Sequence, residues 1–206
     1  MDLSKLKNDV EAKMKASRIG SHVFLDRFRV IQESSRKTAA YTDSRYAPFY
    51  YYLGELIQPK SMVEIGFRLG LLSGCFLKSC KTVENFLGFQ EVGEEFYSPR
   101  LGRSNIKDVY KKSIDIYVGN LYDGEWSKRF KDETWDVIFI NEEKNYDRHM
   151  EYLEAIWPQV AYNGLIFMEH VRYHEPATLA YLNFCKIKNR DSVIIDTRYG
   201  VGMIQK

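Results

Sequence analysis

The chain has 206 residues, a net charge of +2 and 45% hydrophobic residues, which fits one domain with a sizeable core. Lys and Arg residues form no basic block and no apolar run approaches the roughly 18 residues of a membrane span, so we expect neither a nucleic-acid nor a membrane partner. The charged N-terminal region lacks an apolar signal core. The three cysteines are an odd number, and Cys75 and Cys80 are poorly spaced for a disulfide or a metal clip, so we expect a soluble, cytoplasmic protein with reduced thiols.

Residues 1–45 are predicted to form an N-terminal helical extension. In its first part, apolar residues recur at helical spacing among charges: Leu3, Leu6, Val10 and Met14. Ser4 is a candidate N-cap for this helix. The apolar stripe packs either on the domain itself or on a second subunit, so a homodimer through the N-terminal helices is one expectation. A second helical pattern covers residues 24–32.

A strand, a glycine turn and a helix are predicted within residues 61–74 (SMVEIGFRLGLLSG). The apolar run ends in a turn between Gly66 and Gly70, and a helical pattern begins at Leu71. Glycine permits a positive φ and leaves no side chain between the backbone and a ligand. The N-terminus of the following helix supplies free N–H groups and the positive end of a dipole. Such a turn suits a nucleotide-like ligand or a carboxylate, although it is also an ordinary strand-to-helix connection.

Strands and helices alternate along the rest of the chain. Helices are predicted at residues 46–57, 71–79, 106–112, 147–160 and 176–186. Strands are predicted at residues 61–65, 85–89, 113–118, 135–140 and 165–168, and residues 192–196 and 202–205 form a hairpin. This order predicts an α/β, Rossmann-like domain over residues 46–206. We expect a mostly parallel seven-stranded sheet with helices on both faces and a C-terminal antiparallel hairpin.

In such a sheet, ligands bind beyond the carboxyl ends of the strands, near the point where the strand order reverses. The residues that follow the five parallel strands should therefore share one rim: Gly66, Gln90, Asn120, Asn141 and His170.

Four segments of the chain resemble the S-adenosylmethionine-dependent class I methyltransferases. They read VEIGFRLGLLS, FLGFQ, IYVGNLYD and WDVIFINEEKNYDRHMEYLEAIWPQVAYNGLIFMEH. They are most similar to the small-molecule O-methyltransferases related to the catechol and antibiotic-sugar enzymes, over roughly residues 45–206. The resemblance implies S-adenosyl-L-methionine as cofactor and a small-molecule acceptor. A nicotinamide dehydrogenase is disfavoured because the turn lacks the G-x-G-x-x-G fingerprint.

The resemblance also implies a set of cofactor-binding residues. In the family, an acidic residue that ends the first strand and the glycine turn hold the methionine part of the cofactor, and Glu64, Gly66 and Gly70 occupy these positions. A carboxylate at this place accepts from the cofactor's ammonium group. The other expected cofactor-binding residues are Phe67, Arg68, Gln90, Glu91, Asn120, Leu121 and Asn141.

Arg68 stands where many members of the family have a glycine, and three of the other residues depart from the family pattern in ways that matter more. Gln90 stands where an acid usually takes both ribose hydroxyls, and an amide offers one acceptor oxygen against two for a carboxylate. If the strand ends one residue later, Glu91 rather than Gln90 stands at the position that binds the ribose hydroxyls. Asn120 and Asn141 likewise stand where the family has Asp. Because Asn141 and His170 provide no anionic oxygen for a hard cation, we expect no metal site.

Methyl transfer from an activated sulfonium needs mainly an acceptor held in line, helped by a general base if the acceptor is a hydroxyl. We expect His170, with Glu169, to serve as this base, and Tyr146 and Arg172 to contact the acceptor. A purely structural role for each of these four residues is the alternative. The three amides also fit a rival hypothesis, in which the fold has lost its cofactor and acts as a non-catalytic binding or scaffold module.

Overall fold

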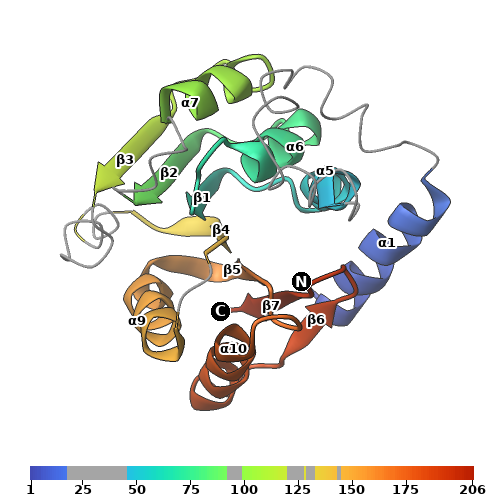
Figure 1. Ribbon diagram of the computed structural model, residues 1–206. Coiled ribbons are helices and arrows are strands. Elements are labelled where there is room, and N and C mark those ends of the chain that lie inside the picture. The colour runs from blue at the N-terminus through green and yellow to red at the C-terminus, as the bar shows by residue number, and fades with distance from the viewer. Residues whose placement is uncertain (18–45, 92–98, 120–127, 129–132, 143–144) are drawn as a thin grey trace.

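The computed structural model describes residues 1–17, 46–91, 99–119, 128, 133–142 and 145–206. Within these residues seven strands form one sheet, in the order β3-β2-β1-β4-β5-β7-β6 (Figure 1). The strands are β1 (Ser61–Ile65), β2 (Asn85–Glu91), β3 (Asp115–Gly119), β4 (Trp135–Ile140), β5 (Val160–Glu169), β6 (Val193–Ile195) and β7 (Val201–Gln205). Strand β7 is antiparallel to both of its neighbours, and the other pairs are parallel. The predicted sheet and its C-terminal hairpin are confirmed.

The strand order reverses at β1, which pairs with β2 on one side and β4 on the other. Glu64 lies opposite Gly88 of β2 and opposite Phe139 of β4. All five residues of β1 are buried, so this strand lies at the centre of the sheet and of the molecule. The switch in strand order therefore coincides with the glycine turn that follows β1.

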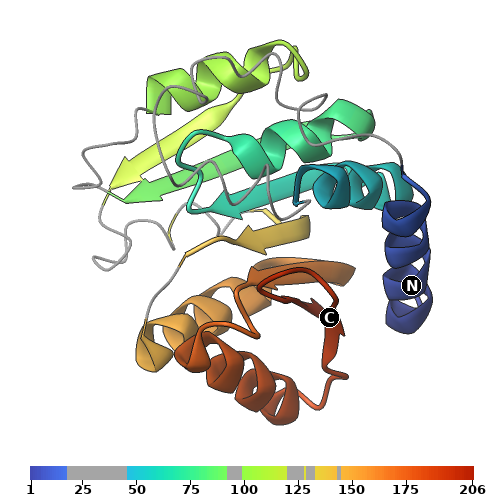
Figure 2. The same cartoon turned by 45° about the vertical axis from the view of Figure 1, so that its right-hand side comes forward.

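Helices cover both faces of the sheet (Figures 1 and 2). On one face, α5 (Tyr46–Ile57), α6 (Leu71–Ser79) and α7 (Pro99–Lys107) pack in a core that includes Phe139 and Phe167. On the other face, α9 (Tyr146–Ile156) and α10 (Glu175–Ile187) pack in a core that includes Ile138 and Ile166. The alternation of side chains along β4 and β5 separates the two cores. No helix of the described residues is long and apolar enough to cross a bilayer.

Helix α1 (Leu3–Ala16) packs against α5 and β6 of its own chain (Figure 2). The predicted apolar stripe is buried there, in the same core as α5. Of the two expected partners of this stripe, the domain itself is therefore the one observed, and the homodimer stays a prediction. The N-cap is Asp2 rather than Ser4, because the Asp2 carboxylate accepts the backbone N–H of Lys5 at 3.0 Å. The carboxylate of Glu11 accepts the backbone N–H of Asp196, in the β6–β7 loop, at 2.9 Å.

Several predicted boundaries were wrong. Helix α7 begins at Pro99, well before the predicted start, because proline is preorganised for the first helical turn. Strand β5 begins at Val160 rather than Leu165, because Val160 pairs with Trp135 across a register shift. Helix α9 ends at Ile156 and a 3₁₀ turn, η1 (Trp157–Gln159), carries the proline. The second helical pattern, at residues 24–32, lies outside the described residues.

Strand β2 extends two residues further than predicted, to Glu91. Gln90 and Glu91 continue the pairing with β3, opposite Val118 and Gly119. Gln90 is therefore inside the strand and buried, and Glu91 is its last residue. The strand thus ends one residue after Gln90, and the role of Glu91 stays a prediction.

Candidate functional site

Three polar residues lie on one face of the sheet where β1, β4 and β5 end. The register places Glu64 opposite Phe139, and Phe139 opposite Phe167. Asn141 lies two residues after Phe139, and Glu169 lies two residues after Phe167. Because side chains alternate between the two faces of a sheet, both residues point to the same face as Glu64. Asn141 follows the last residue of β4, the middle of the three strands, and its backbone N–H donates to the carbonyl of Ile65 at 2.9 Å. The chain thus assembles an acid, an amide and a second acid on adjacent strands.

The carboxyl group of Glu64 is almost fully buried, with 1% of the residue exposed. It accepts from the backbone N–H of Ser73 at 3.2 Å and from the Ser73 hydroxyl, both in the first turn of α6. The pKa of Glu64 is raised to about 8 overall, because the effect of burial, with a smaller contribution from the nearby Glu169, outweighs the hydrogen bonds from Ser73 and Asn141 that lower it.

The glycine turn has the predicted backbone conformation. Gly66 and Gly70 adopt φ values of 86° and 67°. A Cβ atom at Gly66 would lie 2.2 Å from the carbonyl oxygen of Asn141, so the close approach of β4 also requires glycine there. The N–H groups of Gly66 and Phe67 donate to the carbonyl of Phe89 at 3.0 and 2.8 Å, which fixes the turn against β2.

Arg68 and Gln90 hold the tip of this turn. The backbone N–H of Arg68 donates to the side-chain oxygen of Gln90, and Arg68 itself has a positive φ of 45°. The Arg68 guanidinium lies 3.7 Å from the carboxylate of Glu142, which is buried behind the turn. The single acceptor oxygen of Gln90 is therefore engaged within the protein.

The structure also brings Glu169 and His170 to the same rim. Glu169 is 4% exposed and accepts a hydrogen bond from the hydroxyl of Tyr50 on α5. Its other carboxylate oxygen lies 3.7 Å from Nε2 of His170. His170 has a φ of 64°, which is uncommon for a residue with a side chain. Its ring packs against Tyr199 of the β6–β7 loop, with centroids 5.4 Å apart.

Tyr146 and Arg172 are held by other contacts. The Tyr146 hydroxyl accepts a hydrogen bond from Asn183 of α10 at 3.1 Å, and the Arg172 guanidinium pairs with Asp196. Neither of these contacts is with the Glu64–Glu169 cluster. Asn120 and Leu121 lie outside the described residues, as does the side chain of Glu91.

Sequence reasoning missed two residues of this site, Ser73 and Tyr50. Ser73 is the third residue of α6, and a serine in the first turn of a helix that follows a glycine turn is a readable signal. Tyr50 is one of several tyrosines on α5, and nothing in its local sequence distinguishes it. Only the packing of α5 onto the sheet brings its hydroxyl to Glu169.

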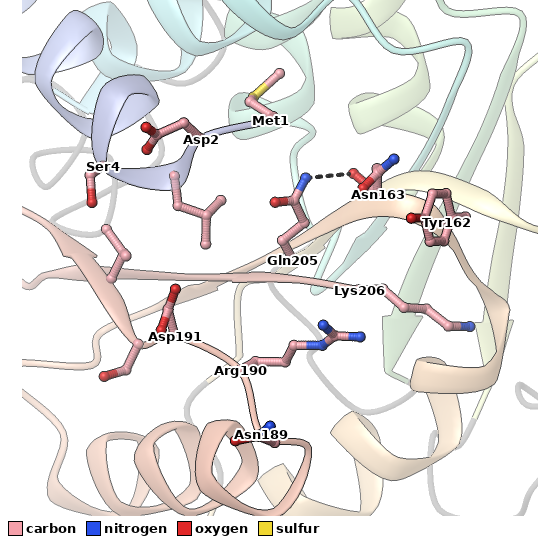
Figure 3. Close-up of a pocket in the computed structure, with 13 residues that line it drawn as sticks. Met1, Asp2, Ser4, Tyr162, Asn163, Asn189, Arg190, Asp191, Gln205 and Lys206 are labelled. Atoms are coloured by element: carbon pink, nitrogen blue, oxygen red, sulfur yellow. Dashed lines mark hydrogen bonds between the residues drawn. The ribbon is translucent and has the colours of Figure 1, made fainter.

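A separate groove of about 740 Å³ lies at the opposite end of the sheet (Figure 3). Tyr162 and Asn163, near the start of β5, line it together with Gln205 and Lys206, at the end of the antiparallel β7. Gln205 donates to the carbonyl of Asn163 at 3.2 Å, and the Lys206 ammonium donates to the carbonyls of η1 and Val160. The side chains of Gln205 and Lys206 thus bind the surrounding backbone, and the groove is remote from the switch point.

No protein-family model and no curated protein match the chain. Solved structures do. A Staphylococcus aureus protein provisionally assigned as a caffeoyl-CoA O-methyltransferase matches with a TM-score of 0.69 and 17% identity, over 100% of both chains. An O-methyltransferase from Bacillus cereus, in complex with SAH, matches with a TM-score of 0.66 and 12% identity, over 100% of both chains. The chain has the methyltransferase fold.

A third match adds a cofactor-bound example. The O-methyltransferase TomG from Streptomyces achromogenes, involved in tomaymycin synthesis and in complex with SAM, matches with a TM-score of 0.64 and 11% identity. The match covers 100% of this chain and 98% of TomG. At these identities the likeness is one of fold. It extends over the N-terminal region as well as the sheet, which is more of the chain than the sequence resemblance covered.

Proposed function

We propose that this protein is an S-adenosylmethionine-dependent methyltransferase that methylates a hydroxyl group of a small molecule without a metal ion. The observation that carries the proposal is the buried Glu64 carboxyl group at the end of β1, beside the glycine turn and the first turn of α6. Whole-chain similarity to methyltransferases in complex with SAM or SAH supports the choice of cofactor.

The residues at the switch point fit this cofactor. S-adenosylmethionine carries an ammonium, a carboxylate and a sulfonium group. A cation beside Glu64 would allow this carboxyl group to ionise, which burial otherwise opposes. The bare backbone of Gly66 and Gly70 and the N-terminus of α6 suit the carboxylate of the cofactor.

The ribose and adenine contacts follow from the resemblance. Gln90 fits a ribose poorly, because its acceptor oxygen already binds the N–H of Arg68. Glu91, as the last residue of β2, is therefore our candidate for the ribose hydroxyls. Asn120 and Leu121 remain the candidates for the adenine side.

The bound cofactor supplies an activated methyl group, and the protein positions the acceptor and removes its proton. We assign proton removal to His170. Glu169 faces His170 Nε2 with one oxygen while the other accepts from Tyr50, so the positive charge of a protonated His170 is stabilised. Tyr146 and Arg172 remain candidate acceptor contacts. Arg172 would have to exchange its partner Asp196 for an anionic acceptor.

Calorimetric titration with S-adenosylmethionine and S-adenosylhomocysteine tests the proposal. We expect micromolar binding by the wild-type protein and none by Glu64→Ala or by the isosteric Glu64→Gln. Glu154→Ala is the matched control, since Glu154 is an exposed acid on α9 that pairs with Lys188. Thermal melting checks that each variant is folded. An absence of binding at millimolar ligand would contradict the proposal and favour a non-catalytic scaffold.

A further inference from the structure

Helix α10 presents two leucines to solvent. Leu179 and Leu182 are 46% and 42% exposed, whereas the opposite face of the helix packs into the core through Ala177, Tyr181 and Phe184. The helix lies on the outside of the sheet, with α9 beside it (Figures 1 and 2). Single exposed apolar residues are common on protein surfaces, so the meaning of these two leucines depends on their neighbours.

Charged residues of opposite sign lie one turn beyond each leucine. Glu175 is four residues before Leu179, and Lys186 is four residues after Leu182. All four residues are exposed, and a spacing of four, three and four places them on one face of the helix. We call this set the α10 stripe. Among the described residues, neither Glu175 nor Lys186 forms an ion pair, so both charges are available to a partner.

The α10 stripe has the same spacing when it is read in either direction, with the two charges exchanged. A second copy of the helix that packs antiparallel about the midpoint of the stripe therefore meets it with complementary side chains. Glu175 then lies opposite Lys186 of the second copy, and Leu179 lies opposite Leu182. The same contacts recur at the other end, as a two-fold axis requires.

Two further apolar side chains extend this surface. Tyr173, in the turn before α10, is 71% exposed, and Ile187, the last residue of the helix, is 60% exposed. An antiparallel pair of helices brings Tyr173 of one copy to the same end as Ile187 of the other. The surface offered to a second copy thus spans the length of α10, which is about 20 Å for its 13 residues.

The helix dipole accounts for only part of this pattern. A glutamate in the first turn and a lysine in the last turn stabilise an isolated helix, so the signs of Glu175 and Lys186 suit a monomer as well. The dipole gives no reason for two exposed leucines between the charges, on the same face. A second helix that covers them accounts for both features.

We propose that the α10 stripe is the contact between two copies of this chain, which associate as an antiparallel dimer with two-fold symmetry. The partner is a second copy because the charges of the stripe complement the same helix in reverse. This surface is distinct from α1, whose apolar stripe is buried within its own chain. Stable interfaces usually bury about 800 Å² on each partner, and one pair of helices offers less, so the dimer dissociates on dilution.

The test is sedimentation velocity of the full chain, from micromolar to millimolar concentrations. We expect a reversible rise of the sedimentation coefficient from the value of a monomer to that of a dimer. Leu179→Glu and Leu182→Glu should each remain monomeric, because a carboxylate replaces an apolar contact twice in the dimer. Tyr162→Glu is the control, since Tyr162 is 89% exposed on β5 and should leave association unchanged. A wild-type monomer at every concentration, or dimers of both leucine variants, would overturn the inference.

Exchange of the two charges tests the antiparallel alignment. Glu175→Lys alone places lysines opposite each other at both ends of the dimer, and Lys186→Glu alone does the same with glutamates. Each should weaken dimerisation by about tenfold. The double variant Glu175→Lys/Lys186→Glu restores opposite charges and should regain the wild-type affinity, with circular dichroism to check that the helix is kept. A double variant no stronger than the single variants would overturn the inference. No cofactor enters these experiments, so their outcome is independent of the proposed function.

Discussion

The hydroxyl of Tyr50 donates a hydrogen bond to the carboxylate of Glu169, although the two residues are 119 positions apart in the chain. Tyr50 is fully buried on α5 and Glu169 ends β5, so this bond ties a helix from one half of the sequence to a strand from the other. It also fixes the oxygen of Glu169 that faces His170. Stability and the chemistry of the site are therefore linked through one hydroxyl group.

Replacing Tyr50 by phenylalanine should lower the free energy of unfolding by about 1.5 to 3 kcal/mol, because a buried carboxylate loses a donor. Denaturant titration followed by circular dichroism measures the change. Tyr52→Phe is the control, since the Tyr52 hydroxyl bonds Ser17 in a half-buried position and should cost less. An equal loss in the two variants would show that the Glu169 bond adds no special stability.

The stability of the cofactor-free protein should fall as the pH rises from about 5 to 8. The pKa of Glu64 is raised to about 8 in the folded protein, so the folded state holds a proton there that the unfolded state has already lost. Stability from this group is fully present below the unfolded pKa and is lost toward pH 8, by at most about 1.4 kcal/mol per pH unit. The free energy of unfolding, measured by denaturant titration at several pH values in this range, should fall more steeply with pH for the wild-type protein than for Glu64→Gln. The same pH dependence of the free energy of unfolding in both proteins would contradict the inference that burial raises the pKa of Glu64.

Gly66→Ala should destabilise the protein by roughly 3 kcal/mol and abolish cofactor binding. Its positive φ strains any side chain, and the added Cβ atom would overlap the carbonyl of Asn141. Gly119→Ala is the matched control, because the added atom would meet the end of the Tyr117 side chain, which can rotate away. Thermal melts and calorimetric titration measure both effects. A Gly66→Ala protein as stable as the control would argue against the tight turn.

His170→Asn should reduce kcat by about 10²- to 10⁴-fold near neutral pH and leave the Kd for S-adenosylmethionine unchanged, because proton removal is lost while the cofactor site is intact. Asparagine tolerates the left-handed backbone that His170 adopts, so the turn is preserved. His174→Asn, at the N-cap of α10, is the control. Full activity in His170→Asn would remove His170 from the mechanism.

Methyl transfer should be insensitive to a chelator. Asn141 contributes a neutral amide and His170 an imidazole, and hard cations prefer anionic oxygens. Activity assays with and without EDTA, followed by addition of Mg²⁺, measure this. Activity that disappears with EDTA and returns with Mg²⁺ would overturn the metal-independent mechanism.

The fold could be predicted because its signals are local. Apolar strands such as Trp135–Ile140 and the glycine turn after β1 are short patterns, and their alternation with helices determines a parallel sheet. The same alternation of strands and helices places the residues that follow the parallel strands at one edge of the sheet. Helix α7 was misplaced because its first turn carries one large apolar residue, Leu101, between an arginine and a glycine, and Pro99 was the clearer signal of its start.

Residues of the candidate site could be predicted only where a polar or titratable side chain lies at the end of a predicted strand. Glu64 was identified from the family resemblance, at the end of the first predicted strand, and Glu169 and His170 from their positions after the predicted strand 165–168. The Tyr50 bond and the engagement of the Gln90 oxygen by Arg68 depend on tertiary packing, which no local pattern encodes. The burial that raises the pKa of Glu64 likewise appears only when α6 packs over β1.

The bond between Glu11 of α1 and the backbone of Asp196 has a consequence for how the molecule assembles during synthesis. The two residues are 185 positions apart, so this contact between α1 and the β6–β7 loop cannot form until the C-terminal hairpin has been synthesised. Contacts of such long range form slowly. The loop that carries Tyr199 onto His170 is anchored by this same bond, so trimming the first helix from a recombinant protein would disturb the rim from the far end of the chain.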